Sequence, residues 1–102
     1  MKPYTVAPEA ESDLWQIWRY LFHEAGLQIA DRIQEEFFAA FEQLTDSPGN
    51  GHRRPDLTAR DVLFFRVYQY MIVYRRATKV EIIAVLHGKR NVKRLLRGRL
   101  SI

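Results

Sequence analysis

The region that most constrains the fold is a run of three apolar segments in the second half of the chain. They are Val62–Val67, Tyr70–Tyr74 and Val80–His87, and they are rich in the β-branched and aromatic residues that favour strands. The breaks between them are Tyr68-Gln69 and Arg75–Lys79, which are too short for a parallel connection of a dozen or more residues. The sequence therefore predicts a three-stranded antiparallel meander, and the preceding residues must cover one of its faces.

Two amphipathic helices are predicted ahead of the meander, and they join at Gly26. The first begins around Pro8, and the second covers about Leu27–Asp46. Trp15 lies off the centre of the apolar stripe of the first helix. Apolar residues recur at three- and four-residue spacing in both helices, as expected for a stripe that faces a core: Ala10, Leu14, Ile17, Trp18, Leu21 and Phe22 in the first, and Ile29, Ala30, Ile33, Phe37, Ala40, Phe41 and Leu44 in the second.

The ends of the chain complete the predicted fold. Pro3–Val6 is expected to be a strand at a sheet edge, because its proline cannot donate to a ladder. Asn91 is expected to cap a short last helix that stops near Gly98, which leaves Arg99–Ile102 frayed. The prediction is an α+β fold of order β-α-α-β-β-β-(α), a helical hairpin packed on a small, mostly antiparallel sheet, with residues 1–102 forming one domain.

Charge is divided unevenly along the chain, whose formal net charge is +4. Residues 1–46 carry an excess of acidic side chains, and residues 47–102 carry a larger excess of basic ones. The division suggests a polarised surface that attracts a polyanion or an acidic partner. The alternative is that the basic half neutralises the acidic half across the fold.

Several classes of protein do not fit the composition. No stretch approaches the roughly 20 apolar residues of a membrane span, and the first residues lack the apolar core of a secretory signal. The chain has no cysteine, which agrees with a cytoplasmic location. The three histidines, His23, His52 and His87, are too far apart to suggest a metal site, so we expect no metal and no cofactor. The acidic helices also argue against helix-turn-helix DNA binding.

Basic and aromatic residues are the candidates for binding. Arg66 and Arg90 stand at the ends of two predicted strands and could approach each other across the sheet, while Tyr68 and Tyr70 flank a hairpin turn and could stack on bases. Other cations lie in the irregular loop Ser47–Asp61 and near the C-terminus. The target-binding candidates, which as a group suit phosphate binding, are Arg53, Arg54, Arg66, Tyr68, Tyr70, Lys89, Arg90, Lys93, Arg94 and Arg97.

The order of the elements and many of the residues in them resemble the RelE/ParE superfamily of bacterial toxins. The resemblance is carried by residues spread over nearly the whole chain: Ala10, Asp13-Leu14, Ile17-Trp18, Ala30, Phe41, Leu44, Pro48, Gly51, Arg53–Leu57, Arg66, Tyr70, Ile72-Val73-Tyr74-Arg75 and Val85–Arg90. The resemblance implies a type II toxin–antitoxin module, with a cognate antitoxin whose C-terminal segment folds along the toxin in a hetero-oligomer.

Two activities share this superfamily, so the fold alone does not choose between them. ParE-like toxins inhibit DNA gyrase, have no catalytic residues of their own and are neutralised by ParD-like antitoxins. RelE-like toxins are endoribonucleases that cut mRNA on the ribosome, and that activity would use Arg66, Arg90 and His87 here. The tyrosine that RelE-like enzymes carry near the C-terminus is absent, because Leu95-Leu96 occupy its place, so the resemblance favours the ParE-like branch. A third reading is a basic nucleic-acid-binding or assembly module without toxicity.

Overall fold

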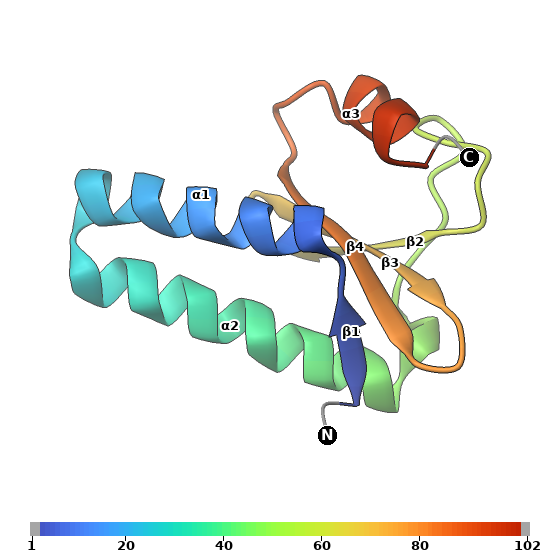
Figure 1. The fold of residues 1–102 in the computed structure, drawn as a ribbon, viewed down its shortest axis with the longest axis horizontal. Helices are drawn as coiled ribbons and strands as arrows, with labels where there is room; N and C mark the ends of the chain where they lie inside the picture. Colours follow the sequence, from blue (N-terminus) through green and yellow to red (C-terminus); the bar gives the residue numbers. More distant parts are fainter. Residues whose placement is uncertain (1–2, 101–102) are drawn as a thin grey trace.

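The computed structural model describes residues 3–100 and confirms the predicted α+β fold (Figure 1). A four-stranded sheet has the order β1-β4-β3-β2, with β1 parallel to β4 and the other pairs antiparallel. The short strand at the N-terminus lies at the sheet edge, as expected. The elements in chain order are β1 (Tyr4–Val6), α1 (Pro8–Ala25), α2 (Leu27–Asp46), the 3-10 turn η1 (Pro48–Asn50), β2 (Leu63–Val67), β3 (Tyr70–Arg76), β4 (Val80–His87) and α3 (Val92–Leu100).

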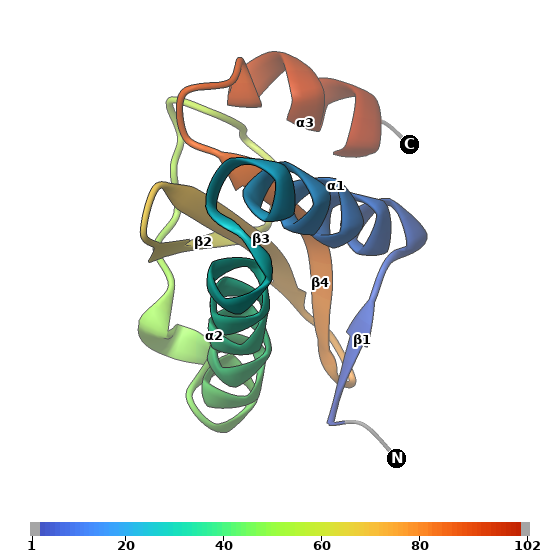
Figure 2. The same ribbon diagram turned by 90° about the vertical axis from the view of Figure 1, so that its left-hand side faces the viewer.

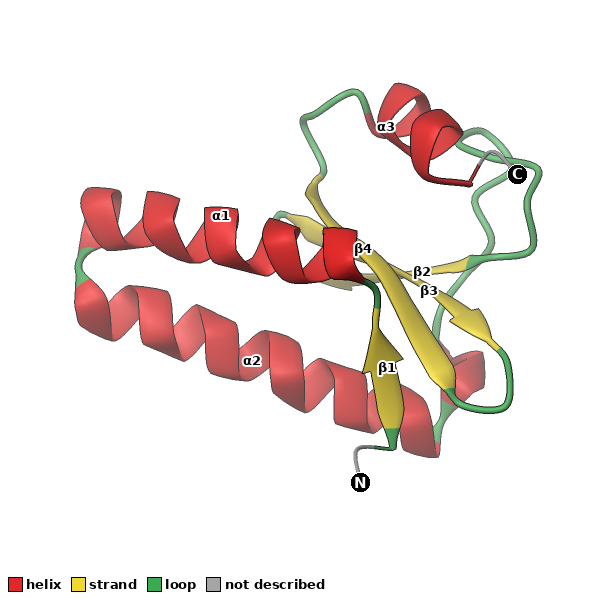
Figure 3. Cartoon of the chain, viewed as in Figure 1, coloured by secondary structure: helices red, strands yellow, loops and turns green. Residues whose placement is uncertain are grey.

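The helical hairpin of α1 and α2 covers one face of the sheet (Figures 1 and 3). Gly26 makes the turn between the two helices with a φ of 94°, a left-handed conformation that glycine adopts without steric cost. Phe37, Phe41 and Leu44 of α2 are fully buried against the sheet. Burial of such side chains contributes roughly 2 kcal/mol each to stability. The core on this face contains more buried residues than the core on the other face.

The opposite face of the sheet carries a second core, which the sequence did not predict. Helix α3 packs there (Figure 2), and its Val92, Leu96 and Leu100 contact Phe64 and Leu86 of the sheet. The expected stop at Gly98 and the expected frayed tail from Arg99 are therefore wrong for the part of the tail that the structure describes, because α3 runs through to Leu100. Residues 101 and 102 lie outside the described residues. Two covered faces explain why β4 is apolar along almost its whole length.

A bulge in β4 distributes its side chains between the two cores. Val73 of β3 pairs with Ala84, whereas the next residue, Tyr74, pairs with Ile82, so Ile83 is the extra residue. Ile82 faces the helical hairpin, and both Ile83 and Ala84 face α3. The irregularity thus shifts the alternation of side chains by one position.

The outer end of the helical hairpin extends beyond the sheet (Figure 1). The inner turns of α1 bury Ala10 and Leu14, but Phe22 is 41% exposed and Trp18 is half-buried. The predicted stripe therefore reaches the core only in its N-terminal half, and the placement of Phe22 in the core is wrong. Trp15 lies off the stripe, as predicted, and is 56% exposed.

A buried ion pair joins the two ends of the chain. Asp13 of α1 is 5% exposed and accepts hydrogen bonds from Nη1 and Nη2 of Arg99 at 2.5 and 2.7 Å. It also accepts one from the backbone N–H of Val85 in β4, at 3.0 Å. The hydrogen bonds to Asp13 raise the pKa of Arg99 further above its ordinary value. This pair fixes α3 across the edge of the sheet.

Tyr74 ties the long loop to the sheet. Its hydroxyl donates to the carbonyl oxygen of Pro48 at 2.6 Å and accepts from the backbone N–H of Gly51 at 2.9 Å. Two backbone hydrogen bonds between His52 and Phe64 then pair the start of the loop with β2. The loop expected to be irregular is therefore anchored at its beginning.

Buried tyrosines should make the fold sensitive to alkali. Burial raises the pKa values of Tyr70 and Tyr74 above their ordinary value, so the folded state holds their protons more tightly than the unfolded chain does. Their contribution to stability is complete below the unfolded pKa of about 10 and is lost as the pH rises through the raised folded pKa, by up to about 1.4 kcal/mol per pH unit for each group. Urea unfolding at pH values on both sides of about 10 measures the slope. Tyr74→Phe should make the slope shallower, and an identical slope would contradict the assignment.

Candidate functional site

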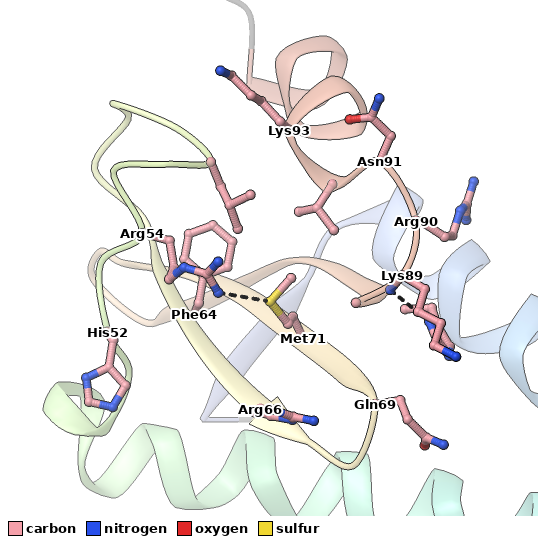
Figure 4. A pocket seen from close by; sticks show the side chains of 14 residues that line it. His52, Arg54, Phe64, Arg66, Gln69, Met71, Lys89, Arg90, Asn91 and Lys93 are labelled. Carbon is pink, nitrogen blue, oxygen red and sulfur yellow. Dashed lines mark hydrogen bonds between the residues drawn. The ribbon is translucent and has the colours of Figure 1, made fainter.

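A basic pocket of about 610 Å³ lies where β2, β3 and the end of β4 meet the loop before α3 (Figure 4). Its floor is apolar, with Leu57, Phe64, Met71 and Val92. No carboxylate lines it among the described residues. The polar and basic side chains around this floor are His52, Arg54, Arg66, Gln69, His87, Lys89, Arg90, Asn91 and Lys93, beside Gly88.

The rim after β4 is shaped by local hydrogen bonds. The N–H of Gly88 donates to the carbonyl oxygen of Gln69 at 2.7 Å, so the chain passes close to the β2–β3 turn. The Lys89 N–H donates to Nδ1 of His87 at 3.0 Å, and Asn91 Oδ1 accepts from the N–H of Arg94 at 3.1 Å as the predicted cap of α3. These contacts hold Lys89 and Arg90 at the mouth of the pocket.

The charges in the pocket are only partly neutralised. Arg54 binds Asp56 through two hydrogen bonds, which hold the pKa of that carboxyl below its usual value. Arg54 also points a guanidinium N–H at the sulfur of Met71 (Figure 4). Within residues 3–100, no ion pair involves Arg66, Lys89, Arg90 or Lys93, which together therefore leave a net positive rim.

The ion pairs between described residues test the alternative that the basic half of the chain neutralises the acidic half. Asp13–Arg99 crosses from the acidic half to the basic half. Arg53–Asp61, Arg54–Asp56 and Arg75–Glu81 all lie within the basic half. Most of the acidic hairpin therefore does not cancel the cations of the pocket.

The structure brings together half of the predicted target-binding residues. Arg54, Arg66, Lys89, Arg90 and Lys93 line the pocket, although Arg90 and Lys93 extend outward from its rim (Figure 4). Arg53 instead pairs with Asp61 and lines a different cavity of about 360 Å³. Arg94 and Arg97 are exposed on α3 and do not line the pocket.

The two candidate tyrosines differ sharply in their exposure to solvent. Tyr70 is 7% exposed, and its ring packs edge-on against Phe37 and His87. It is therefore not available to stack on a base, which corrects that prediction. Tyr68 is 51% exposed, has a positive φ of 54° and donates its hydroxyl proton to the carboxylate of Glu36 at about 2.7 Å. That hydrogen bond raises its pKa and holds the turn against α2.

The sequence did not single out the apolar floor of the pocket or its hydrogen-bonding side chains. Phe64 and Met71 read as ordinary strand residues, and Gln69 reads as a turn residue. Alternation along β2 and β3 could have indicated that Phe64 and Met71 share the face opposite the helical hairpin. Nothing in the sequence indicates that α3 leaves part of this face open.

A second groove of about 570 Å³ adjoins the pocket and shares Gln69, His87 and Arg90 with it. Its aliphatic side chains come mainly from the helical hairpin, with Ile17, Leu21, Ile29 and Ile33, and Asp13 also lines it. The two cavities therefore offer an apolar half and a basic half to a single elongated ligand.

The described residues were also compared with the requirements of a metal site and of a membrane-spanning helix. In residues 3–100, no group of three or more histidine, aspartate or glutamate side chains could hold a metal ion. The helices found in that range are too polar or too short to cross a bilayer. The chemistry on offer is electrostatic: arginine and lysine side chains around an apolar floor suit an anionic ligand.

Comparison with known proteins agrees with this geometry. The model of the family described as "ParE toxin of type II toxin-antitoxin system, parDE" matches residues 4–92. Toxin ParE1 of Caulobacter vibrioides is 33% identical over 95 residues, which cover 91% of this chain and 96% of the relative. A solved structure titled "Chromosomal ParDE TA system from P. aeruginosa" has the same fold, with a TM-score of 0.71 at 16% identity, over 82% of this chain and 92% of that one.

The family match places this domain, a helical hairpin on a mixed sheet, in the class of ParE-like toxins of the RelE/ParE superfamily. The family match extends through α1, α2 and all four strands and ends at the first residue of α3. The chain belongs to the ParE toxin family of type II toxin–antitoxin systems.

Proposed function

We propose that this toxin inhibits DNA gyrase by binding it through the basic pocket, without a bond-breaking step of its own. The family membership supports this function. The observation that carries it is how the fold engages His87 and which side chains α3 places beside the cations. Nδ1 of His87 accepts the Lys89 N–H and its ring packs on Tyr70, while Leu96 of α3 is fully buried. The Nδ1 atom of His87 is therefore occupied by the fold, and α3 places a buried leucine rather than a proton-transfer side chain beside the cations.

The two adjoining cavities support an antitoxin as the second partner. An acidic segment with apolar side chains would place those side chains between Ile17 and Ile33 and its carboxylates near Arg90. Such a segment would cover the cations that we assign to the target, so a ParD-like antitoxin would neutralise the toxin by occupying the same surface in a hetero-oligomer.

Gyrase poisoning is tested with purified protein, gyrase and plasmid DNA. We expect the toxin to accumulate cleaved complexes, and we expect Arg66→Ala combined with Arg90→Ala to reduce that accumulation roughly tenfold, since exposed charge pairs contribute up to about 1 kcal/mol each. Arg19→Ala, at an exposed position on α1, is the matched control and should act like the parent. In cells, expression should stop growth unless the antitoxin is made too. Normal supercoiling at high toxin concentration would exclude the proposal.

A ribosome-dependent endoribonuclease is the second candidate, because Arg66, His87 and Arg90 lie in one pocket. Cleavage would need a base for the ribose 2′-hydroxyl and cations for the charged transition state. Primer extension on mRNA after induction separates the two functions. Codon-phased cuts within minutes that disappear in His87→Ala would favour this candidate over gyrase, and intact message would remove it.

A further inference from the structure

The outer flank of α1 carries an aromatic ladder formed by Trp15, Trp18 and Phe22. The rings of Trp15 and Trp18 lie 5.6 Å apart, and those of Trp18 and Phe22 lie 5.2 Å apart, each pair within 8° of parallel. Trp15 is 56% exposed and Phe22 is 41% exposed. Residues spaced by three and four positions lie on one line along a helix, so the three rings form a continuous exposed strip.

The ladder lies outside the hydrophobic core. The core beneath the hairpin takes Ala10, Leu14 and Ile17 from α1, and none of the three rings belongs to it. Large aromatic side chains gathered at the surface of a small domain mark an interaction site more often than a solvated face. The ladder is therefore a surface that another molecule should cover.

Carboxylates outnumber cations beside the ladder. The Nε1–H of Trp18 donates to Asp31 of α2 at 2.9 Å, and Glu11 continues the line of the ladder one turn before Trp15, while Arg19 is an exposed cation one turn after Trp15. Residues 1–46 hold 9 acidic side chains against 3 lysines and arginines. Arginine suits such a surface because its guanidinium stacks on aromatic faces and also pairs with carboxylates.

The ladder is separate from the groove proposed for the antitoxin. The groove takes Asp13, Gln16, Ile17, Tyr20 and Leu21 from α1. At 100° per residue, the centre of this set points to the side of the helix opposite Trp15 and Trp18. A ligand in the groove would leave the ladder free, so the two surfaces can be occupied together.

We propose that the aromatic ladder of α1 is a second docking surface, and that it binds an arginine-bearing, amphipathic segment of a protein partner. A second copy of the hairpin fits less well, since two acidic flanks would then face each other. The inference goes beyond the proposed function, because the ladder shares no residue with the basic pocket or the adjoining groove.

Intrinsic fluorescence provides the test, because Trp15 and Trp18 are the two tryptophans of the chain and both report on this flank. The probe is a synthetic amphipathic helical peptide of leucine and arginine, compared with the same peptide carrying glutamate in place of arginine. We expect the arginine peptide to shift the emission and the glutamate peptide to leave it unchanged. Trp15→Gln, and separately Phe22→Gln, should weaken binding about tenfold, whereas Tyr20→Gln, on the other side of α1, should not.

Three results would overturn the proposal. The first is equal binding of both peptides. The second is that Trp15→Gln and Phe22→Gln bind the arginine peptide as tightly as the parent does. The third is no binding of either peptide. Sedimentation without peptide adds a fourth outcome: a dimer that Trp15→Gln abolishes would assign the ladder to a second copy of the chain instead. Circular dichroism of each variant checks that it is folded, which both exposed positions should permit.

Discussion

Replacing Asp13 with asparagine should lower the free energy of unfolding by about 3 kcal/mol, since removing one member of a buried ion pair leaves the other charge without compensation. Arg99 is mostly buried in the folded protein, and it would keep its charge and lose its carboxylate. In a domain of this size the change corresponds to a melting temperature lower by more than about 10 °C. The released end of α3 should also become more accessible to trypsin, which makes limited proteolysis a second measurement.

The matched control is Asp31→Asn, which changes an exposed carboxylate that accepts one hydrogen bond from Trp18. It should change the stability by less than about 0.5 kcal/mol. The double variant Asp13→Asn with Arg99→Gln should be less destabilised than the sum of the two single variants, because each single change already breaks the pair. Strict additivity would show that the ion pair is not what holds α3 in place.

Gly51→Ala is expected to cost about 2 kcal/mol of stability, as overpacking does in a filled core. A Cβ atom at Gly51 would lie 2.7 Å from Cε1 and 2.8 Å from Cζ of Tyr74, a side chain that is fully buried. The tyrosine would have to move, and its hydrogen bonds to Pro48 and Gly51 would be strained. The φ of Gly51 is −81°, which any residue can adopt, so the effect comes from space alone. Urea unfolding measures it.

Gly49→Ala is the control for this change, because a Cβ atom at Gly49 would meet nothing within 4 Å. The two glycines lie in the same loop and differ mainly in their distance from Tyr74. We expect the control to keep the stability of the parent to within about 0.5 kcal/mol. Equal stability of both variants would mean that the loop shifts freely and that Tyr74 does not anchor it.

The predictions from the sequence were most accurate where the local spacing of residues decides the structure. The meander could be predicted because short breaks between strands leave only antiparallel pairing, and the helical hairpin because its stripes repeat over many turns. The prediction was wrong for Phe22, since the spacing of apolar residues does not show how far the sheet extends beneath a helix. It was also wrong for Arg99, whose partner Asp13 lies at the other end of the chain.

The candidate site could be predicted only in part. Charge along the chain indicated the cations near the end of β4 and at Arg66, and these do line one pocket. The sequence could not separate Arg54 from its neighbour Arg53, because the direction of each side chain depends on which carboxylate it meets in the folded loop. Nor could it show that Tyr70 is buried while Tyr68, two residues earlier, is exposed.

The amino-acid sequence by itself determined the order of the elements, the antiparallel meander and the basic character of the second half, because these depend on local periodicity and composition. Only the tertiary structure decided that α3 closes the second face of the sheet, that the basic pocket opens beside it, and that the aromatic ladder stays uncovered. These features depend on contacts between distant segments such as Asp13 with Arg99 and Gly51 with Tyr74. Such pairs have no signature in the spacing of residues along the chain, since packing in three dimensions brings them together.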